Sequence, residues 1–241
     1  MAFTHGKTTC VYLNGYDLSP FLNSVEVARS VDTAETSTFS VASKTYITGE
    51  VDSQLNFEGL YDDAAKASDV VLAAALANNT IWTWYPGKLS TANNTGYGFV
   101  GIQTGYTPSS TITDAVKIVG SCQGSDDVAS RELGVSLHLM GEETTTGTGT
   151  IIDDNTDASA NGASAYLQAT DVTGTVELVV EHSSNATFSA DVSTLLSFTN
   201  ISADNIAERI EVTGAVKRYI RASWTVGSGE TLTFNVLFCR R

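Results

Sequence analysis

A chain of 241 residues is long enough for one large all-β domain or for two domains of ordinary size. Its net charge of −14 excludes the basic footprint with which proteins grip nucleic-acid phosphates or anionic membranes. Only 17% of the residues are charged, and Thr, Ser, Asn and Gly take the place of the missing charges. This composition favours strands and turns over helices.

The three cysteines, Cys10, Cys122 and Cys239, lie far apart and form no CxxC motif. They therefore indicate neither a disulfide framework nor a zinc site, and we expect no metal and no cofactor. The first fifteen residues contain no apolar core of a signal peptide, and no run approaches the length of a membrane span. We therefore expect a protein that stays soluble in the cytosol and does not bind membranes.

The chain begins with short strand signals. Residues 9–13 are an apolar run that leads into Asn14 and Gly15, the dipeptide of a tight type I′ hairpin turn. Residues 21–29 and 50–60 alternate apolar with polar side chains, which predicts two half-buried strands.

Residues 30–48 between these strands are polar and rich in Thr and Ser. We interpret them as a long loop or an extended hairpin, and long connections in compact domains are usually functional or disordered. The large side chains of Phe39 and Tyr46 suggest that this segment folds onto another surface.

Residues 62–77 change to a helical pattern. The segment is rich in alanine, the best helix former, and acidic residues stand at its beginning, where the helix dipole favours negative charge.

Four further strands follow. The first of these strands contains the strongest aromatic cluster of the sequence, which consists of Trp82, Trp84 and Tyr85. We expect these side chains in the core or at a subunit interface. The four strands are predicted at residues 81–85, 97–106, 115–122 and 134–140.

A linker separates this part from a second run of strands. Residues 141–150 contain no core-forming side chain, and small and acidic residues continue beyond them. We predict a first domain at 1–144, a linker at 145–162 and a second domain at 163–241. The regular spacing of turns in the second domain predicts a β-sandwich. Its strands are expected at residues 165–172, 175–182, 192–198, 209–213, 219–226 and 231–238.

No constellation of catalytic residues emerges. His5, His138 and His182 have no ligand spacing between them, and adjacent acids such as Asp62 and Asp63 point apart instead of across a cleft. We therefore expect a protein that is not an enzyme. A basic cluster near the C-terminus could either pair with acids on a neighbouring subunit or protect strand edges. It consists of Arg209, Lys217, Arg218, Arg221, Arg240 and Arg241.

Over residues 5–140 the chain resembles the major tail (tail tube) proteins of long-tailed bacteriophages. The segments that carry this resemblance are HGKTTCVYLNGYDLSPFLNSVEVARSVDTAETSTFS, KTYITGEVDSQLNFEGLYDDAAKASDVVLAAAL, GYGFVGIQTGY and VKIVGSCQGSDDVASRELGVSLH. The later stretch ERIEVTGAVKRYIRASW resembles the extra β-domain that is fused to some phage structural proteins.

The resemblance implies a mainly all-β fold, a sandwich or barrel with one flanking helix followed by a second β-sandwich domain. It also implies a virion protein, assembled in the host cytoplasm, whose hexameric rings stack into a tube. The partners would be other copies of the chain, other tail proteins, and double-stranded DNA that passes through the lumen without specific binding.

The same resemblance assigns roles to particular residues. The segment 30–48 would reach the adjacent ring through Asp32, Glu35, Phe39, Lys44 and Tyr46. The helix 62–77 would pack neighbouring subunits through Asp63, Lys66 and Asp69. Two alternatives stay open: a head-decoration or head–tail joining protein, and a carbohydrate- or receptor-binding module carried by the second domain.

Overall fold

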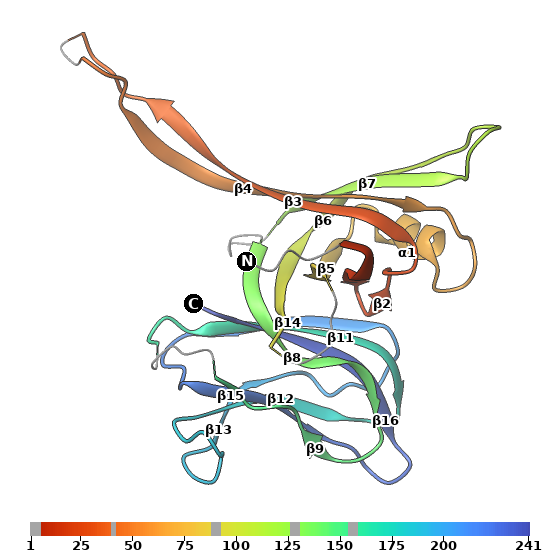
Figure 1. The fold of residues 1–241 in the computed structure, drawn as a ribbon, viewed down its shortest axis with the longest axis vertical. Helices are drawn as coiled ribbons and strands as arrows, with labels where there is room; N and C mark the ends of the chain where they lie inside the picture. The colour runs from red at the N-terminus through yellow and green to blue at the C-terminus, as the bar shows by residue number, and fades with distance from the viewer. Residues whose placement is uncertain (1–5, 40–41, 88–92, 126–130, 154–158) are drawn as a thin grey trace. The chain divides into compact units, whose positions relative to one another are not determined.

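The computed structural model describes residues 6–39, 42–87, 93–125, 131–153 and 159–241. Within these ranges the chain is mostly strand with one α-helix, an all-β and sandwich-like fold as predicted (Figure 1). It divides into two compact units. Unit 1 consists of Met1–Pro20, Ile81–Gly98 and Glu132–Arg241, and unit 2 of Phe21–Thr80 and Phe99–Arg131.

Unit 1 contains a sandwich of two antiparallel sheets. Four neighbouring strands of one sheet are, in order, β14 (Ile206–Val212), β11 (Ala163–Thr173), β16 (Thr231–Arg240) and β8 (Arg131–Glu143). The other has the order β10 (Ile152–Asp153), β15 (Tyr219–Thr225), β12 (Glu177–Ser183) and β13 (Ser193–Ser197), and β9 (Gly147–Thr148) also pairs with β15. All six strands expected in the second domain are therefore present.

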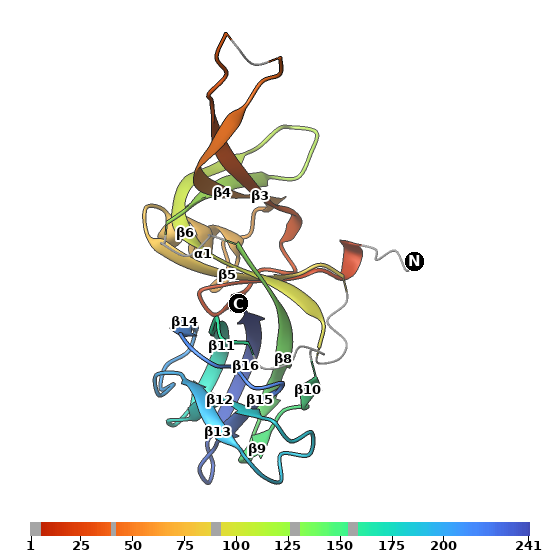
Figure 2. The same cartoon turned by 90° about the vertical axis from the view of Figure 1, so that its left-hand side faces the viewer.

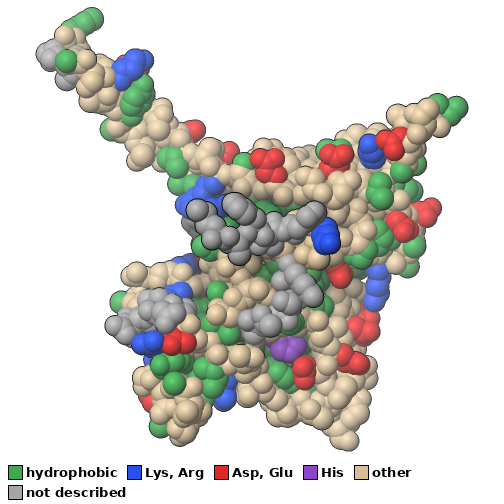
Figure 3. Space-filling model, in the orientation of Figure 1, with side chains coloured by type: hydrophobic (Ala, Val, Ile, Leu, Met, Phe, Trp, Pro, Cys, Tyr) green, Lys and Arg blue, Asp and Glu red, His purple; other side chains and the backbone are tan. Residues whose placement is uncertain are grey.

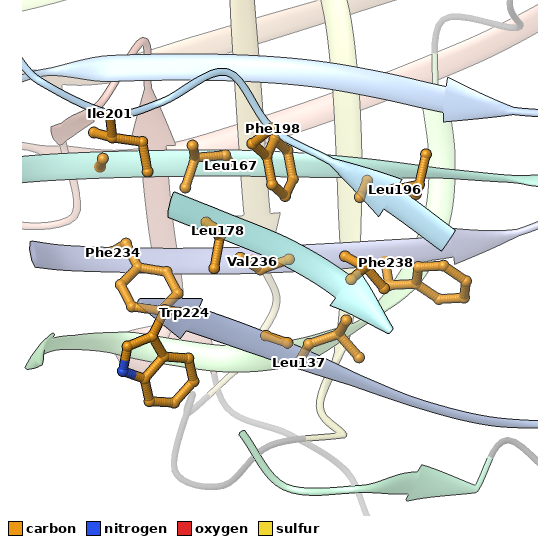
Figure 4. Close-up of a cluster of buried hydrophobic side chains, with 14 of the residues drawn as sticks. Leu137, Leu167, Leu178, Leu196, Phe198, Ile201, Trp224, Phe234, Val236 and Phe238 are labelled. Carbon is orange, nitrogen blue, oxygen red and sulfur yellow. The ribbon is translucent and has the colours of Figure 1, made fainter. Parts of the chain in front are cut away.

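Alternation along the strands builds the core between the two sheets. In β12, for example, Leu178 and Val180 are buried, whereas Glu177 is exposed. Figure 4 shows Leu178 lying among Leu167 and Val236 from the facing sheet. Burying each such side chain stabilises the fold by about 1.5–3 kcal/mol, and the cluster is the main source of stability in unit 1.

The N-terminal residues belong to unit 1. A short 3₁₀ helix, η1 (Gly6–Thr8), precedes β1 (Cys10–Leu13), which pairs with both β2 (Tyr16–Asp17) and β5 (Asn79–Tyr85). The turn after β1 has positive φ at both central residues, 48° at Asn14 and 82° at Gly15, which confirms the predicted type I′ hairpin.

Two buried amides attach these N-terminal strands to the C-terminal sandwich. Gln168 Oε1 accepts a hydrogen bond from Gly15 N at 2.7 Å, and its Nε2 donates to Ile81 O at 3.1 Å. Asn235 Oδ1 accepts from the Tyr85 hydroxyl at 2.7 Å. Each amide is fully buried, so these bonds are needed to offset the cost of burying it.

The division of the chain therefore differs from the predicted domains 1–144 and 163–241. Residues 1–20 and 81–98 group with the C-terminal sandwich. The predicted linker 145–162 also contains strands β9 and β10, and its residues 154–158 lie outside the described ranges. It is part of the sandwich because Trp224 Nε1 donates to Thr145 O at 3.0 Å and β9 pairs with β15.

Unit 2 is built on one antiparallel sheet. Its strands follow in the order β3 (Leu22–Glu35), β4 (Tyr46–Leu60), β7 (Lys117–Gly124) and β6 (Thr95–Ser109), of which β6 begins in unit 1. One face of the sheet buries Leu55, Phe57 and Ile118. The helix α1 (Ser68–Ala75) is held by Gln103 of β6, whose Nε2 donates to Leu72 O at 2.7 Å.

The helix is shorter than the predicted segment 62–77, because Asp62 starts a turn. Its Oδ1 accepts a hydrogen bond from Ala64 N at 2.9 Å, a local bond that competes with helix formation. Lys66 then has a φ of 67°, which a helix does not allow. The hydroxyl of Ser68 donates to Leu60 O at 2.7 Å and so fixes the point where the helix begins.

Candidate assembly surfaces

The β3–β4 hairpin extends beyond the rest of its sheet. β4 pairs with β7 only from Gln54 to Leu60, whereas its pairing with β3 continues to Tyr46 (Figures 1 and 2). We call residues 29–35 and 46–52 the distal ribbon. Every residue in it is exposed. Among the described residues the ribbon therefore has no third strand and no covering layer.

Large apolar side chains are distributed along this ribbon and its connection (Figure 3). Val31 and Val51 face each other as a directly paired couple, and both are nearly half exposed. Tyr46 is 54%, Ile47 59% and Phe39 114% exposed. A two-stranded hairpin is only marginally stable in water. An exposed apolar ribbon of this kind gains stability when another surface covers it.

The five residues predicted for an inter-ring loop lie on this hairpin. Asp32 and Glu35 are on β3, Tyr46 begins β4 opposite Glu35, and Phe39 and Lys44 lie in the connection. Lys44 Nζ and Glu35 Oε2 form an exposed ion pair at 2.9 Å. Of the two interpretations left open for residues 30–48, the structure shows the extended hairpin.

The three residues predicted for a subunit-packing helix are separated by the late start of α1. Asp63 and Lys66 are exposed in the preceding turn, so their predicted position on a helix is wrong. Asp69 is in the first turn of α1, and its Oδ1 accepts a hydrogen bond from the Tyr106 hydroxyl. Burial and this bond to Asp69 raise the pKa of Tyr106. Asp69 is therefore engaged within its own chain.

The aromatic cluster lies mainly in the core. Trp82 and Tyr85 are each 1% exposed, so they are closed to a partner. Trp84 is half-buried and stacks on Tyr97, with 5.1 Å between ring centroids. Of the three predicted interface residues, only Trp84 reaches the surface.

The C-terminal basic cluster pairs with acids of the same chain. Its side chains form ion pairs with Glu132, Glu181 and Asp191, among others, at N–O distances of 2.8–3.1 Å. Lys217 and Ser184 hydrogen-bond Asp191 and lower its pKa to about 2. Arg240 instead donates to the backbone carbonyls of residues 216–218. The sequence left two roles open for this cluster, which were pairing with acids of a neighbouring subunit and protection of strand edges. The structure shows pairing with acids of the same chain.

The described ranges contain His, Cys, Asp and Glu side chains, which are groups that bind metal ions in proteins. No group of three or more His, Cys, Asp or Glu side chains there could hold a metal ion. His182 Nδ1 accepts a hydrogen bond from Lys217 N at 3.2 Å, and burial together with the Lys217 charge lowers its pKa. His5 lies outside the described residues. None of the helices in the described ranges has the length and apolar character needed to cross a membrane.

Comparisons with known proteins add little to this geometry. No protein-family model matches the sequence, and no curated protein matches it. Among solved structures, the chain is similar to the crystal structure of the Dit (gp 19.1) protein of SPP1. That protein is described as a paradigm of the hub adsorption apparatus of phages that infect Gram-positive bacteria. The match covers 97% of this chain and 100% of that one, with 9% identity and a TM-score of 0.36. A TM-score this low carries no functional argument.

Proposed function

We propose that this chain is a structural subunit of a bacteriophage tail, which assembles with copies of itself into hexameric rings that stack as a tube. It acts in the virion by assembly and not by catalysis, and it is assembled in the host cytoplasm beside other tail proteins. The observation that carries this proposal is the distal ribbon, whose exposed apolar side chains have no partner within the described parts of the chain.

A second copy of the chain is the occupant that we propose for this ribbon. The ribbon is one surface, and it would dock on a different surface of the next copy. Such a head-to-tail contact closes into a ring when the rotation between copies closes. The sequence resemblance to tail tube proteins over residues 5–140 supports this choice of partner, because the hairpin lies within that region.

The charge of unit 2 fits a surface past which DNA slides. The unit has 12 acidic and 5 basic residues, a net charge of −7. The register pairs Ser24 with Glu58 and Ser30 with Asp52, so these side chains share the face opposite to the buried one. Glu26 lies on the same face. In the rows between these pairs this face holds no Lys or Arg, because Arg29, paired with Ser53, lies on the opposite face, and we propose that the face repels phosphate inside the tube.

The most direct test deletes the distal ribbon and keeps the rest of the sheet of unit 2. Ser30 and Asp52 are direct neighbours across the hairpin, so an Asn-Gly turn in place of residues 31–51 would close it. We expect this variant to fold as a monomer and to form no rings by negative-stain electron microscopy. Rings or tubes that still form from the shortened protein would contradict the assignment of the ribbon.

Point substitutions provide a matched control. Phe39→Ser together with Ile47→Ser removes apolar surface from the hairpin, whereas Ile112→Ser removes an equally exposed side chain from the connection between β6 and β7. Only the first variant should lose assembly. Single rings that never stack would favour a head–tail joining protein. An unmodified chain that stays monomeric at every concentration would overturn ring formation.

A further inference from the structure

A pocket with a volume of about 470 Å³ lies within unit 1 at the end of β8. One wall is the strand β8 and the other is β9 with the two residues after it, and Trp224 of β15 lies between them. This size is within the range of small-ligand sites in proteins. The pocket is lined by Leu137, His138, Leu139, Glu143, Gly147, Thr148, Gly149, Thr150 and Trp224.

The aromatic rings beside the pocket form a rigid, preformed cluster. His138 is nearly parallel to Phe234, with 4.1 Å between ring centroids and an angle of 8°. Trp224 meets both rings edge-on, at 4.9 Å from His138 and 5.5 Å from Phe234. Figure 4 shows Trp224 and Phe234 against each other at one end of the core. Because these rings are already packed, a ligand would not have to order them.

Hydrogen-bonding groups converge on the same space. Glu143 Oε1 is 3.1 Å from His138 Nε2, while Glu143 Oε2 makes no hydrogen bond among the described residues. The other ring nitrogen, His138 Nδ1, is 3.2 Å from Phe234 O. The imidazole thus holds Glu143 in place and leaves one carboxylate oxygen available to accept hydrogen bonds from a ligand.

The wall opposite β8 is a strand edge. Among the described residues β9 pairs with β15 alone, and Gly149 N donates to Ala222 O at 2.9 Å on that side. Backbone groups alternate in direction along a strand, so the N–H and C=O of Thr148, which lines the pocket, point away from β15. The lining of the pocket therefore includes a backbone donor and acceptor as well as a carboxylate.

We infer that this pocket binds a neutral saccharide unit. Sugar hydroxyls both donate and accept, so they match a pocket lined by a carboxylate oxygen and by a backbone N–H and C=O. An anionic ligand would be repelled by Glu143 in a chain of net charge −14. A peptide strand would find only the two residues of β9 as a template. This inference goes beyond ring assembly and does not depend on it, because the site lies within one subunit.

The test is a titration of the full ¹⁵N-labelled chain followed by NMR. The probes are glucose, galactose, N-acetylglucosamine and rhamnose, with N-acetylneuraminic acid and glycerol phosphate as anionic probes. We expect at least one neutral sugar, and neither anion, to shift the amide signals of Thr148 and Gly149 and the indole N–H signal of Trp224. The inference is overturned when no neutral sugar shifts these signals, or when the anions shift them equally.

Two variants with the same change of charge locate the site. Glu143→Gln should weaken binding about tenfold, since a hydrogen bond to a charged group is replaced by one to a neutral group. Glu142→Gln alters the neighbouring exposed residue, which does not line the pocket, and should bind as the unaltered chain does. Equal affinities for the two variants would place the sugar elsewhere and overturn the inference. The ribbon-deleted chain should bind the sugar unchanged.

Discussion

At the scale of single residues, Gly15 shows how a local turn and a distant contact depend on the same position. Its φ is +82°, and a Cβ built there would lie 2.4 Å from the carbonyl carbon of Asn205 and 2.6 Å from Ala169 O. The turn needs the positive φ, and the neighbouring backbone needs the missing side chain. No other residue type meets both needs at this position.

Gly15→Ala should therefore destabilise unit 1 by about 3 kcal/mol, through backbone strain and overpacking together. Gly229→Ala is the matched control, because φ is +80° there and a Cβ would meet nothing within 4 Å. It should cost only about 1 kcal/mol of strain. Urea unfolding followed by tryptophan fluorescence measures both, since all three tryptophans lie in unit 1. Equal losses would show that the close contacts at Gly15 relax freely.

Glu132 is a second residue on which distant segments depend. It is 9% exposed and accepts hydrogen bonds from the Tyr166 hydroxyl at 2.5 Å and from Arg209 Nε at 3.0 Å. Arg241, the last residue of the sequence, also donates to it at 3.1 Å. Burial acts to raise the pKa of Glu132, but the bonds from Arg209 and Tyr166 outweigh it and hold the pKa below the ordinary value of 4.5.

We expect Glu132→Gln to destabilise unit 1 by about 2 kcal/mol at neutral pH, because the buried guanidinium of Arg209 loses the carboxylate at its Nε and keeps its ion pair with Glu211. The folded chain binds fewer protons at this carboxyl than the unfolded chain does. Its contribution to stability is therefore present above pH 4.5 and lost as the pH falls below it. The difference between the variant and the unaltered chain should shrink in urea titrations below that pH. A constant difference down to low pH would contradict the role given to the charge.

At the scale of elements, alternation in the sequence located the strands but not their grouping. The alternation of apolar and polar residues belongs to the sequence of each strand. It therefore indicates β12 and β16 as strands regardless of which elements they contact. The grouping of residues 1–20 with the C-terminal sandwich depends on Gln168 and Asn235, two polar residues within apolar strands. No local pattern marks such residues as partners of a segment more than 140 residues away.

For a different reason, the sequence left a loop and a hairpin open for the distal ribbon and gave no sign of the pocket. Strand 29–35 is polar on both faces except for Val31 and Ala34, so no buried face produces an alternating signal. Gly147 and Gly149 appeared to belong to a linker because they contribute no core side chain. Their lack of side chains is instead what allows β9 to approach Trp224 and Leu137. The composition of a segment shows which side chains can fill a core. It does not show where the backbone must come close to another element and therefore requires glycine.

The C-terminus of α1 offers a direct test of element stability. Ala77 follows the helix with a φ of +62°, a left-handed conformation that glycine adopts at low cost. Ala77→Gly should stabilise unit 2 by about 0.5–1 kcal/mol, since relief of strain exceeds the added entropy of the unfolded chain. Because the tryptophans report on unit 1, hydrogen exchange of the Leu72 amide is the appropriate measurement. Faster exchange in the variant would show that Ala77 is not strained.

At the scale of the whole molecule, the two units differ in their surfaces. The exposed apolar ribbon belongs to unit 2, whereas the ion pairs between basic and acidic side chains are mostly in unit 1. The basic residues of unit 1 are largely matched with acids or carbonyls of that unit. The distal ribbon of unit 2 exposes Val31, Tyr46 and Ile47 on a hairpin without a third strand. Self-assembly should therefore change unit 2 at the ribbon and leave the sandwich of unit 1 as it is.

Hydrogen exchange measures this difference residue by residue. In dilute, unassembled protein the amides of residues 29–35 and 46–52 should exchange rapidly, because a lone hairpin opens at little cost in free energy. In assembled rings the same amides should slow by about tenfold or more, which corresponds to burial worth about 1.4 kcal/mol or more. The amides of residues 54–60 serve as the internal control, since β4 is paired with both β3 and β7 there and is protected in either state. Rings whose ribbon amides exchange as fast as those of the dilute protein would show that the ribbon is not the contact that holds the copies together.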